Sequence, residues 1–167
     1  MIKAILACAV GILLTAPAFA GGPPASNKSI QHGEFLVNYG GCQDCHTPGW
    51  AENGGHAPKD ALLTGSGMNF QGPWGTTYAA NLRLYVAKLT AKQWIANLRA
   101  LKARPAMPWW TFRYLSDRDL IDMYAYIRSL GPAGEPAHAW VPPGQDAPAP
   151  YLKLVLPAPP PAQPGGE

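Results

Sequence analysis

Three segments of the chain carry apolar residues at helical spacing, three and four positions apart. They are 30–39, 90–102 and 116–130, and a helix is predicted for each. A residue that can cap the helix precedes or opens each segment: Ser29, Thr90 and Ser116. The first helix is expected to end at the glycine pair GG and the last at Gly131-Pro132, because glycine and proline terminate helices.

The segment 47–89 has no clear period and contains the turn sequences ENGGH, TGSG and GPWG. We therefore expect long loops between the first and second helices. No strand is predicted in this region, and the expected fold class is all-α.

The composition changes after the last helix. Residues 131–167 include eleven prolines and five glycines, too many for a packed helix or a central strand. We expect an extended, polyproline II or disordered tail. Its apolar run YLKLVL, residues 151–156, is the exception, since it can dock as an edge strand on this protein or on a partner.

The N-terminus has the pattern of an export signal. Lys3 precedes the apolar run 4–14, and Ala18-Phe19-Ala20 is a small-x-small cleavage site. Cys8 lies inside the apolar run; lipidation there and an uncleaved anchor are the alternatives to cleavage after Ala20. No later segment approaches the roughly 18 apolar residues that a membrane span needs, so we expect no transmembrane span in the mature chain and export to the periplasm.

These boundaries define the expected organisation. The predicted parts are a signal peptide (1–20), a flexible leader (21–28), one domain (29–131) and a Pro/Ala-rich tail (132–167). The formal net charge of +3 falls to +2 when Lys3 is removed, which is too small to indicate a nucleic-acid partner.

Two cysteines remain after the signal, Cys42 and Cys45, and His46 follows directly. C-x-x-C can also indicate a disulfide, a thioredoxin-like redox pair or half of a zinc site. The sequence has no second C-x-x-C to complete a zinc site and no βαβ pattern typical of a thioredoxin. C-x-x-C-H is the attachment site of c-type haem. On one helical turn, both thiols can reach the vinyl groups of the ring while the imidazole binds the iron. We predict one covalent haem c.

Met107 is the predicted second axial ligand of the iron. Pro105 and Pro108 bracket it and forbid a helix, so a rigid extended loop would present the thioether. Met123, on the last helix, is expected to be a core residue. The alternatives to Met107 are Met68, His56, His138 or an open site.

Further side chains are candidates for contacts with the haem. Trp74, Tyr78 and Asn81 carry donors that could hold the haem propionates, although core packing would also explain them. His32, on the first predicted helix, is expected to be a surface side chain.

The chain contains, in this order, CQDCH, RPAMPW and LSDRDLIDMYAYIRSL. These motifs resemble those of class I c-type cytochromes, and the surrounding sequence is similar to single-haem domains in the cytochrome subunits of periplasmic sugar, alcohol and aldehyde dehydrogenases. The resemblance implies a cytochrome c-like fold with His46 and Met107 as axial ligands. It also implies that the first helix, around Gly33, crosses the last helix, around Tyr126. The carbonyl that orients His46 would belong to the Pro58 region or to Pro48.

The predicted function is electron transfer between redox partner proteins, without catalysis by the chain itself. A periplasmic dehydrogenase and a terminal oxidase are the candidate partners. The alternatives are a haem subunit bound stably in a dehydrogenase complex, and a haem enzyme or gas sensor with an open iron site. Seven cations and no acid lie between Asp60 and Asp117, and they are expected to surround the Met107 loop and attract an acidic partner. These cations are Arg83, Lys88, Lys92, Arg99, Lys102, Arg104 and Arg113.

Overall fold

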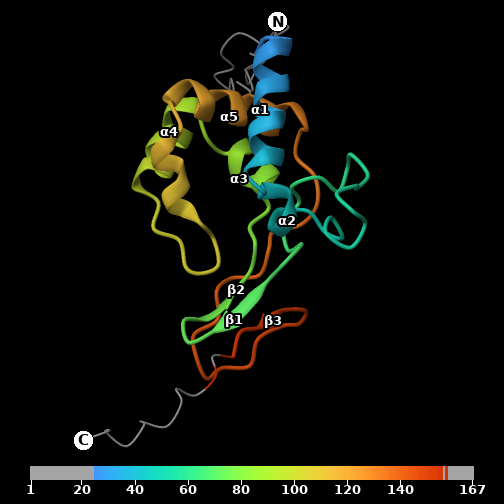
Figure 1. Ribbon diagram of the computed structural model, residues 1–167, viewed down its shortest axis with the longest axis vertical. Helices are drawn as coiled ribbons and strands as arrows, with labels where there is room; N and C mark the ends of the chain where they lie inside the picture. Colours follow the sequence, from blue (N-terminus) through green and yellow to red (C-terminus); the bar gives the residue numbers. More distant parts are fainter. Residues whose placement is uncertain (1–24, 156, 158–167) are drawn as a thin grey trace, which may run out of the picture.

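The computed structural model describes residues 25–155 and residue 157. The predicted signal peptide and the first half of the predicted leader, residues 21–24, lie outside this range. Helices gather at one end of the molecule, and a small sheet lies at the other end (Figure 1). The fold is mostly helical, but the prediction of an all-α protein missed this sheet.

Helices α1 (Asn27–Tyr39) and α5 (Asp117–Ser129) cross and form the top of the molecule (Figure 1). Gly33 lies at the crossing, where its Cα faces the backbone of Asp122 and the Cβ of Tyr126. A side chain at position 33 would not fit between the helices. The crossing that the resemblance implied is therefore confirmed.

Helix α1 begins earlier than predicted. Ser26 is its N-cap, because the Ser26 hydroxyl accepts a hydrogen bond from the Ser29 backbone at 3.2 Å. Ser29, the predicted cap, lies inside the helix and is buried. Its hydroxyl donates to the Asp122 carboxylate of α5 instead. The sequence offers two serines three residues apart, and only the tertiary contact with α5 separates their roles.

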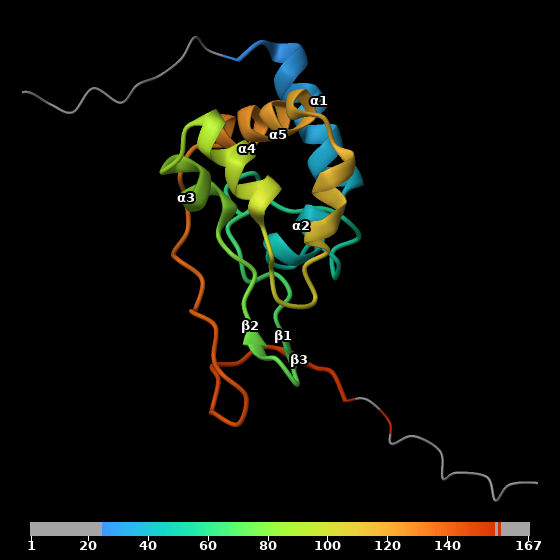
Figure 2. The ribbon, with the colours of Figure 1, turned by 90° about the vertical axis from the view of Figure 1, so that its left-hand side faces the viewer.

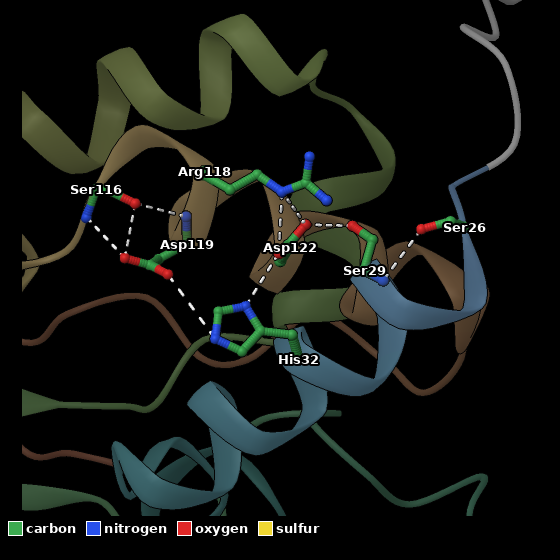
Figure 3. A network of polar contacts seen from close by, with 7 residues as sticks. All are labelled: Ser26, Ser29, His32, Ser116, Arg118, Asp119 and Asp122. Atoms are coloured by element: carbon green, nitrogen blue, oxygen red, sulfur yellow. Dashed lines mark hydrogen bonds and ion pairs between the residues drawn. The ribbon is translucent and has the colours of Figure 1, made fainter.

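A polar network joins the two crossed helices (Figure 3). The Asp122 carboxylate is 4 % exposed and lies 3.0 Å from the His32 ring and 3.1 Å from the Arg118 guanidinium. His32 is 45 % exposed, as expected for a surface residue. A buried carboxylate needs such partners, because an unpaired charge in the interior is costly.

Helices α3 (Leu82–Ala87) and α4 (Ala91–Ala100) pack on the other side of α5. The predicted capping box at Thr90 is confirmed, and so is the one at Ser116. The Trp94 indole donates to the Leu120 carbonyl at 2.8 Å and ties α4 to α5. A 3-10 helix, η1 (Trp109–Tyr114), connects the loop after α4 to α5.

The segment predicted as loops contains three short elements. Strands β1 (Phe70–Gly72) and β2 (Gly75–Thr77) form an antiparallel hairpin, and α3 follows. Each strand has only three residues, so a pattern of period two has no length in which to appear. α3 is also short, with Asn81 as its N-cap.

The chain after α5 runs from the helical end down to the hairpin, in orange and red in Figure 2. There β3 (Leu152–Lys153) pairs in parallel with β1, which gives the sheet order β2-β1-β3. The run predicted as an edge strand therefore docks on this protein. Hydrogen bonds from Tyr78 to the Pro148 carbonyl (2.6 Å) and from Asn69 to the Pro150 carbonyl (3.0 Å) fix it further.

Candidate haem-binding site

The C-x-x-C-H motif forms the single-turn helix α2 (Cys42–His46). Cys42, Cys45 and His46 all line one cavity of about 380 Å³, whose other lining residues come from α3, α4, α5, the hairpin and the loop after α4. The structure thus brings the three predicted residues to one wall. The volume falls in the range of about 300–1,000 Å³ typical of ligand and cofactor sites.

His46 is buried, and its Nδ1 lies 2.7 Å from the carbonyl oxygen of Ala80. A carbonyl only accepts hydrogen bonds, so Nδ1 carries the proton and Nε2 keeps a free lone pair. Burial lowers the pKa of His46, and the bond to Ala80 opposes that shift only in part. The imidazole is therefore in the neutral form that binds a metal.

The acceptor of this bond was not found from the sequence. Pro48 and the Pro58 region were the candidates, and the structure uses Ala80, 34 residues after His46. Every residue except proline offers the same backbone groups, so no residue type marks such an acceptor. The turn into α3 brings Ala80 to the ring, and this turn exists only in the folded chain.

Neither cysteine of the motif forms a disulfide. Burial raises the pKa of Cys42 to about 11 and also raises the pKa of Cys45, which the nearby Asp44 carboxylate raises further. They face one cavity from the same helical turn. The donor set, with two thiols, a neutral imidazole and an apolar wall, fits a covalently attached haem.

Three methionines line the cavity: Met68, Met107 and Met123. Met123 is 3 % exposed and packs in the core cluster with Leu120 and Ile127, as predicted for a core residue. The backbone N–H of Met68 donates to the Cys45 carbonyl at 3.0 Å, so Met68 lies beside the segment that carries His46. Met107 belongs to the separate loop after α4.

The three predicted propionate donors have other surroundings. Asn81 donates to the carbonyls of Ala133 and Glu135 at 2.8 and 3.1 Å and does not line the cavity. Tyr78 lines the cavity, but its hydroxyl proton is used by the Pro148 carbonyl. Trp74 lies outside the cavity wall, and its buried Nε1 has no hydrogen-bond partner within the described residues.

Of the predicted ring of seven cations, two are structural. Arg83 is 7 % exposed and donates to several backbone carbonyls, including those of Gly131 (2.5 Å) and Asp60 (3.1 Å). Arg99 donates to the carbonyls of Phe112 and Leu115 and pairs with Asp117. The prediction that Arg83 faces a partner is wrong, because backbone acceptors hold its buried guanidinium. For Arg99, whose side chain is partly exposed, docking stays a prediction.

Arg104 is the cation that faces the cavity. It lines the wall beside Met107, and its guanidinium has no hydrogen bond within the part of the chain that the structure describes. Its Cζ lies 3.9 Å from the centre of a Trp140 ring. Arg104 was predicted only as one of the surface charges around the Met107 loop, and its position three residues before Met107 was the available signal for a place in the cavity wall.

A family comparison decides what this site is. The model of the family described as "Cytochrome c" matches residues 30–131, which include most of α1, all of α2 to α5 and the whole cavity wall. The chain belongs to the cytochrome c family. The cytochrome therefore carries covalently bound haem c, and one domain with one C-x-x-C-H accounts for one haem.

A curated relative gives a closer comparison. The cytochrome is 27 % identical over 144 residues to the fructose dehydrogenase cytochrome subunit of Gluconobacter japonicus. The match covers 80 % of this chain and 25 % of that relative, so the cytochrome spans about a quarter of the relative's length. No solved structure matches the chain with significance. Within residues 25–155, no helix is long and apolar enough to cross a membrane.

Proposed function

We propose that this cytochrome is a periplasmic electron-transfer protein whose haem iron is held by His46 and Met107. Haem c, when bound, supplies a one-electron couple between ferrous and ferric iron. The observation that carries the proposal is the single cavity that collects Cys42, Cys45, His46 and Met107. The export pattern of residues 1–20 supports the location.

His46 has the features of the first axial ligand. Its Nδ1 proton is committed to the Ala80 carbonyl, so only Nε2 is available to a metal. The same bond fixes the ring plane and raises the basicity of the ligand. Burial keeps the imidazole neutral at physiological pH, since it lowers the pKa of His46.

Met107 is favoured over Met68 because of the chain segments to which each belongs. To hold a haem iron together with His46, the second ligand would have to approach it from a different segment of the cavity wall. The hydrogen bond from Met68 N–H to the Cys45 carbonyl ties Met68 to the segment of His46. Met107 comes from the loop after α4, and its own turn is closed by bonds from Met107 N–H to the Arg104 carbonyl (3.3 Å) and from Trp109 N–H to the Met107 carbonyl (2.9 Å).

The remaining wall gives the cavity a mostly apolar lining. Side chains from four helical elements form it, and most are apolar: Leu82, Trp94, Leu98, Phe112, Met123 and Ile127. An apolar, low-dielectric site shapes the reduction potential, and a thioether ligand favours the ferrous form. If His46 and Met107 both hold the iron, no substrate would need to bind it.

Substitution of the methionines tests the ligation. Met107→Ala should keep the haem attached, abolish the sulfur-to-iron charge-transfer band, lower the reduction potential and allow carbon monoxide to bind the ferrous protein. Met68→Leu and Met123→Leu are matched controls from the same cavity and should keep the band. If Met68→Leu loses the band and Met107→Ala keeps it, the assignment is wrong. Carbon monoxide binding by the unmodified protein would instead indicate an open site.

The relative supports a second candidate function, that of a haem subunit in a dehydrogenase complex. The 27 % identity to a dehydrogenase cytochrome subunit favours it. Size-exclusion chromatography of native extracts, followed by haem staining, separates the two candidates. A free carrier elutes near its own mass of 17.8 kDa or less, and a subunit elutes with the complex.

A further inference from the structure

The C-terminal segment touches the loop that carries Met107. Trp140 lies on this segment, between α5 and β3. The Arg104 guanidinium stacks on its ring, with 3.9 Å between Cζ and the ring centre. A cation at this distance from an indole face is attracted to it electrostatically. Arg104 stands three residues before Met107 in the same loop.

Trp140 is itself anchored to the hairpin. Its Nε1 donates to the Trp74 carbonyl at 2.9 Å. The next residue, Val141, exchanges two backbone hydrogen bonds with Thr76 of β2, at 2.8 and 3.0 Å. The indole therefore has a fixed position relative to the sheet.

Gly75 makes this close approach possible. A Cβ at position 75 would lie 2.2 Å from the Val141 carbonyl oxygen and 2.9 Å from Trp140 Nε1, and the φ of Gly75 is +94°. Both facts require glycine. The hairpin is thus shaped to receive the C-terminal segment at the position of Trp140.

The loop 101–108 has few other supports. It contains no helix or strand. One hydrogen bond joins it to the hairpin, from the Thr77 hydroxyl to the Pro105 carbonyl at 2.8 Å. The stacking of Arg104 on Trp140 is a second contact with the same end of the molecule. Because Arg104 and Met107 both line the cavity, a shift of the loop would move the thioether.

We propose that Trp140 is a positioning residue for the Met107 loop: it holds the Arg104 guanidinium against the sheet and thereby keeps the Met107 thioether at the haem cavity. The C-terminal segment is then part of the ligand site, although it lies outside the family match that ends at residue 131. This inference rests on the proposed function, in which Met107 binds the iron.

The test compares Trp140→Ala, Trp140→Phe and Leu154→Ala in the full-length protein with haem attached. Loss of the stacking surface should raise the apparent equilibrium constant for carbon monoxide binding by the ferrous protein about tenfold, which corresponds to about 1.4 kcal/mol. The ferric charge-transfer band should weaken and the reduction potential should fall. Trp140→Phe keeps an aromatic face and should restore most of both signals. Leu154 is 44 % exposed on the same segment, so Leu154→Ala should match the unmodified protein.

Arg104→Gln removes the other partner of the same contact, so it tests the positioning role even if Trp140→Ala does not fold. It should reproduce the weaker band, and the double variant with Trp140→Ala should be no worse than either single one. Unchanged carbon monoxide binding in Trp140→Ala, or additive effects in the double variant, would overturn the positioning role. Met107→Ala is the reference variant. If it keeps the charge-transfer band, the assignment of Met107 as an iron ligand is wrong. If it loses the band while the Trp140 and Arg104 variants keep theirs unchanged, only the positioning role of Trp140 is wrong.

Discussion

A methyl group added at the crossing of α1 and α5 should strongly destabilise the cytochrome. In Gly33→Ala, the new Cβ would lie 1.9 Å from the Asp122 carbonyl oxygen and 2.4 Å from its carbonyl carbon. Real Cβ contacts do not fall below 3.0 Å, so the helices must separate by about 1.1 Å at this point. The obstacle is backbone, which cannot rotate away as a flexible side chain can.

Gly33→Ala has two destabilising effects and one stabilising effect on the folded protein. Overpacking typically costs about 1–3 kcal/mol, and weakening the buried Ser29–Asp122 hydrogen bond adds about 1.5–3 kcal/mol because its acceptor is charged. Alanine returns about 1 kcal/mol through its better helix propensity. We expect the free energy of unfolding to fall by about 1.5–5 kcal/mol.

Urea unfolding followed by far-ultraviolet circular dichroism measures this change. Gln31→Ala is the control, since Gln31 is exposed on the same helix and its truncation should change stability by less than about 0.5 kcal/mol. A loss below 1 kcal/mol in Gly33→Ala, or a gain, would refute the argument that the helices are in backbone contact.

Two further predictions concern buried charges. Burial raises the pKa of Asp122, but hydrogen bonds from Ser29, His32 and Arg118 outweigh it and lower the pKa below its ordinary value. Its stabilising contribution is therefore present above the unfolded pKa of about 3.9 and is lost as pH falls through the folded value. Asp122→Asn should flatten the decline of stability below about pH 4 in urea titrations, and an unchanged acid slope would contradict this role. Arg83→Lys should cost about 3 kcal/mol at neutral pH without altering the haem spectrum, because an ammonium cannot satisfy the carbonyls of Gly131, Leu130, Asp60 and Lys59 together. Lys88→Ala, at an exposed site, is its control, and equal stability of the two variants would speak against a structural Arg83.

The local features of this cytochrome could be predicted from the sequence. The capping boxes at Thr90 and Ser116 predicted where α4 and α5 begin, because those hydrogen bonds join residues only three apart. The C-x-x-C-H spacing indicated covalent haem in the same way, since one helical turn brings the three side chains together. Pro105 and Pro108 predicted that the Met107 loop is not helical, through their own ring geometry.

Contacts between distant segments were decided by the tertiary structure. Three such features join residues that are 34 or more positions apart or depend on how loops are closed. They are the Ala80 carbonyl that orients His46, the stack of Arg104 on Trp140, and the burial of Arg83. Every residue has a backbone carbonyl, so the sequence does not mark which one will accept a hydrogen bond. An arginine is also the same letter in the sequence whether its guanidinium is exposed or buried. The pairing of β3 with β1 belongs to this group, because the apolar run 151–156 could dock on any free sheet edge until the fold placed β1 beside it.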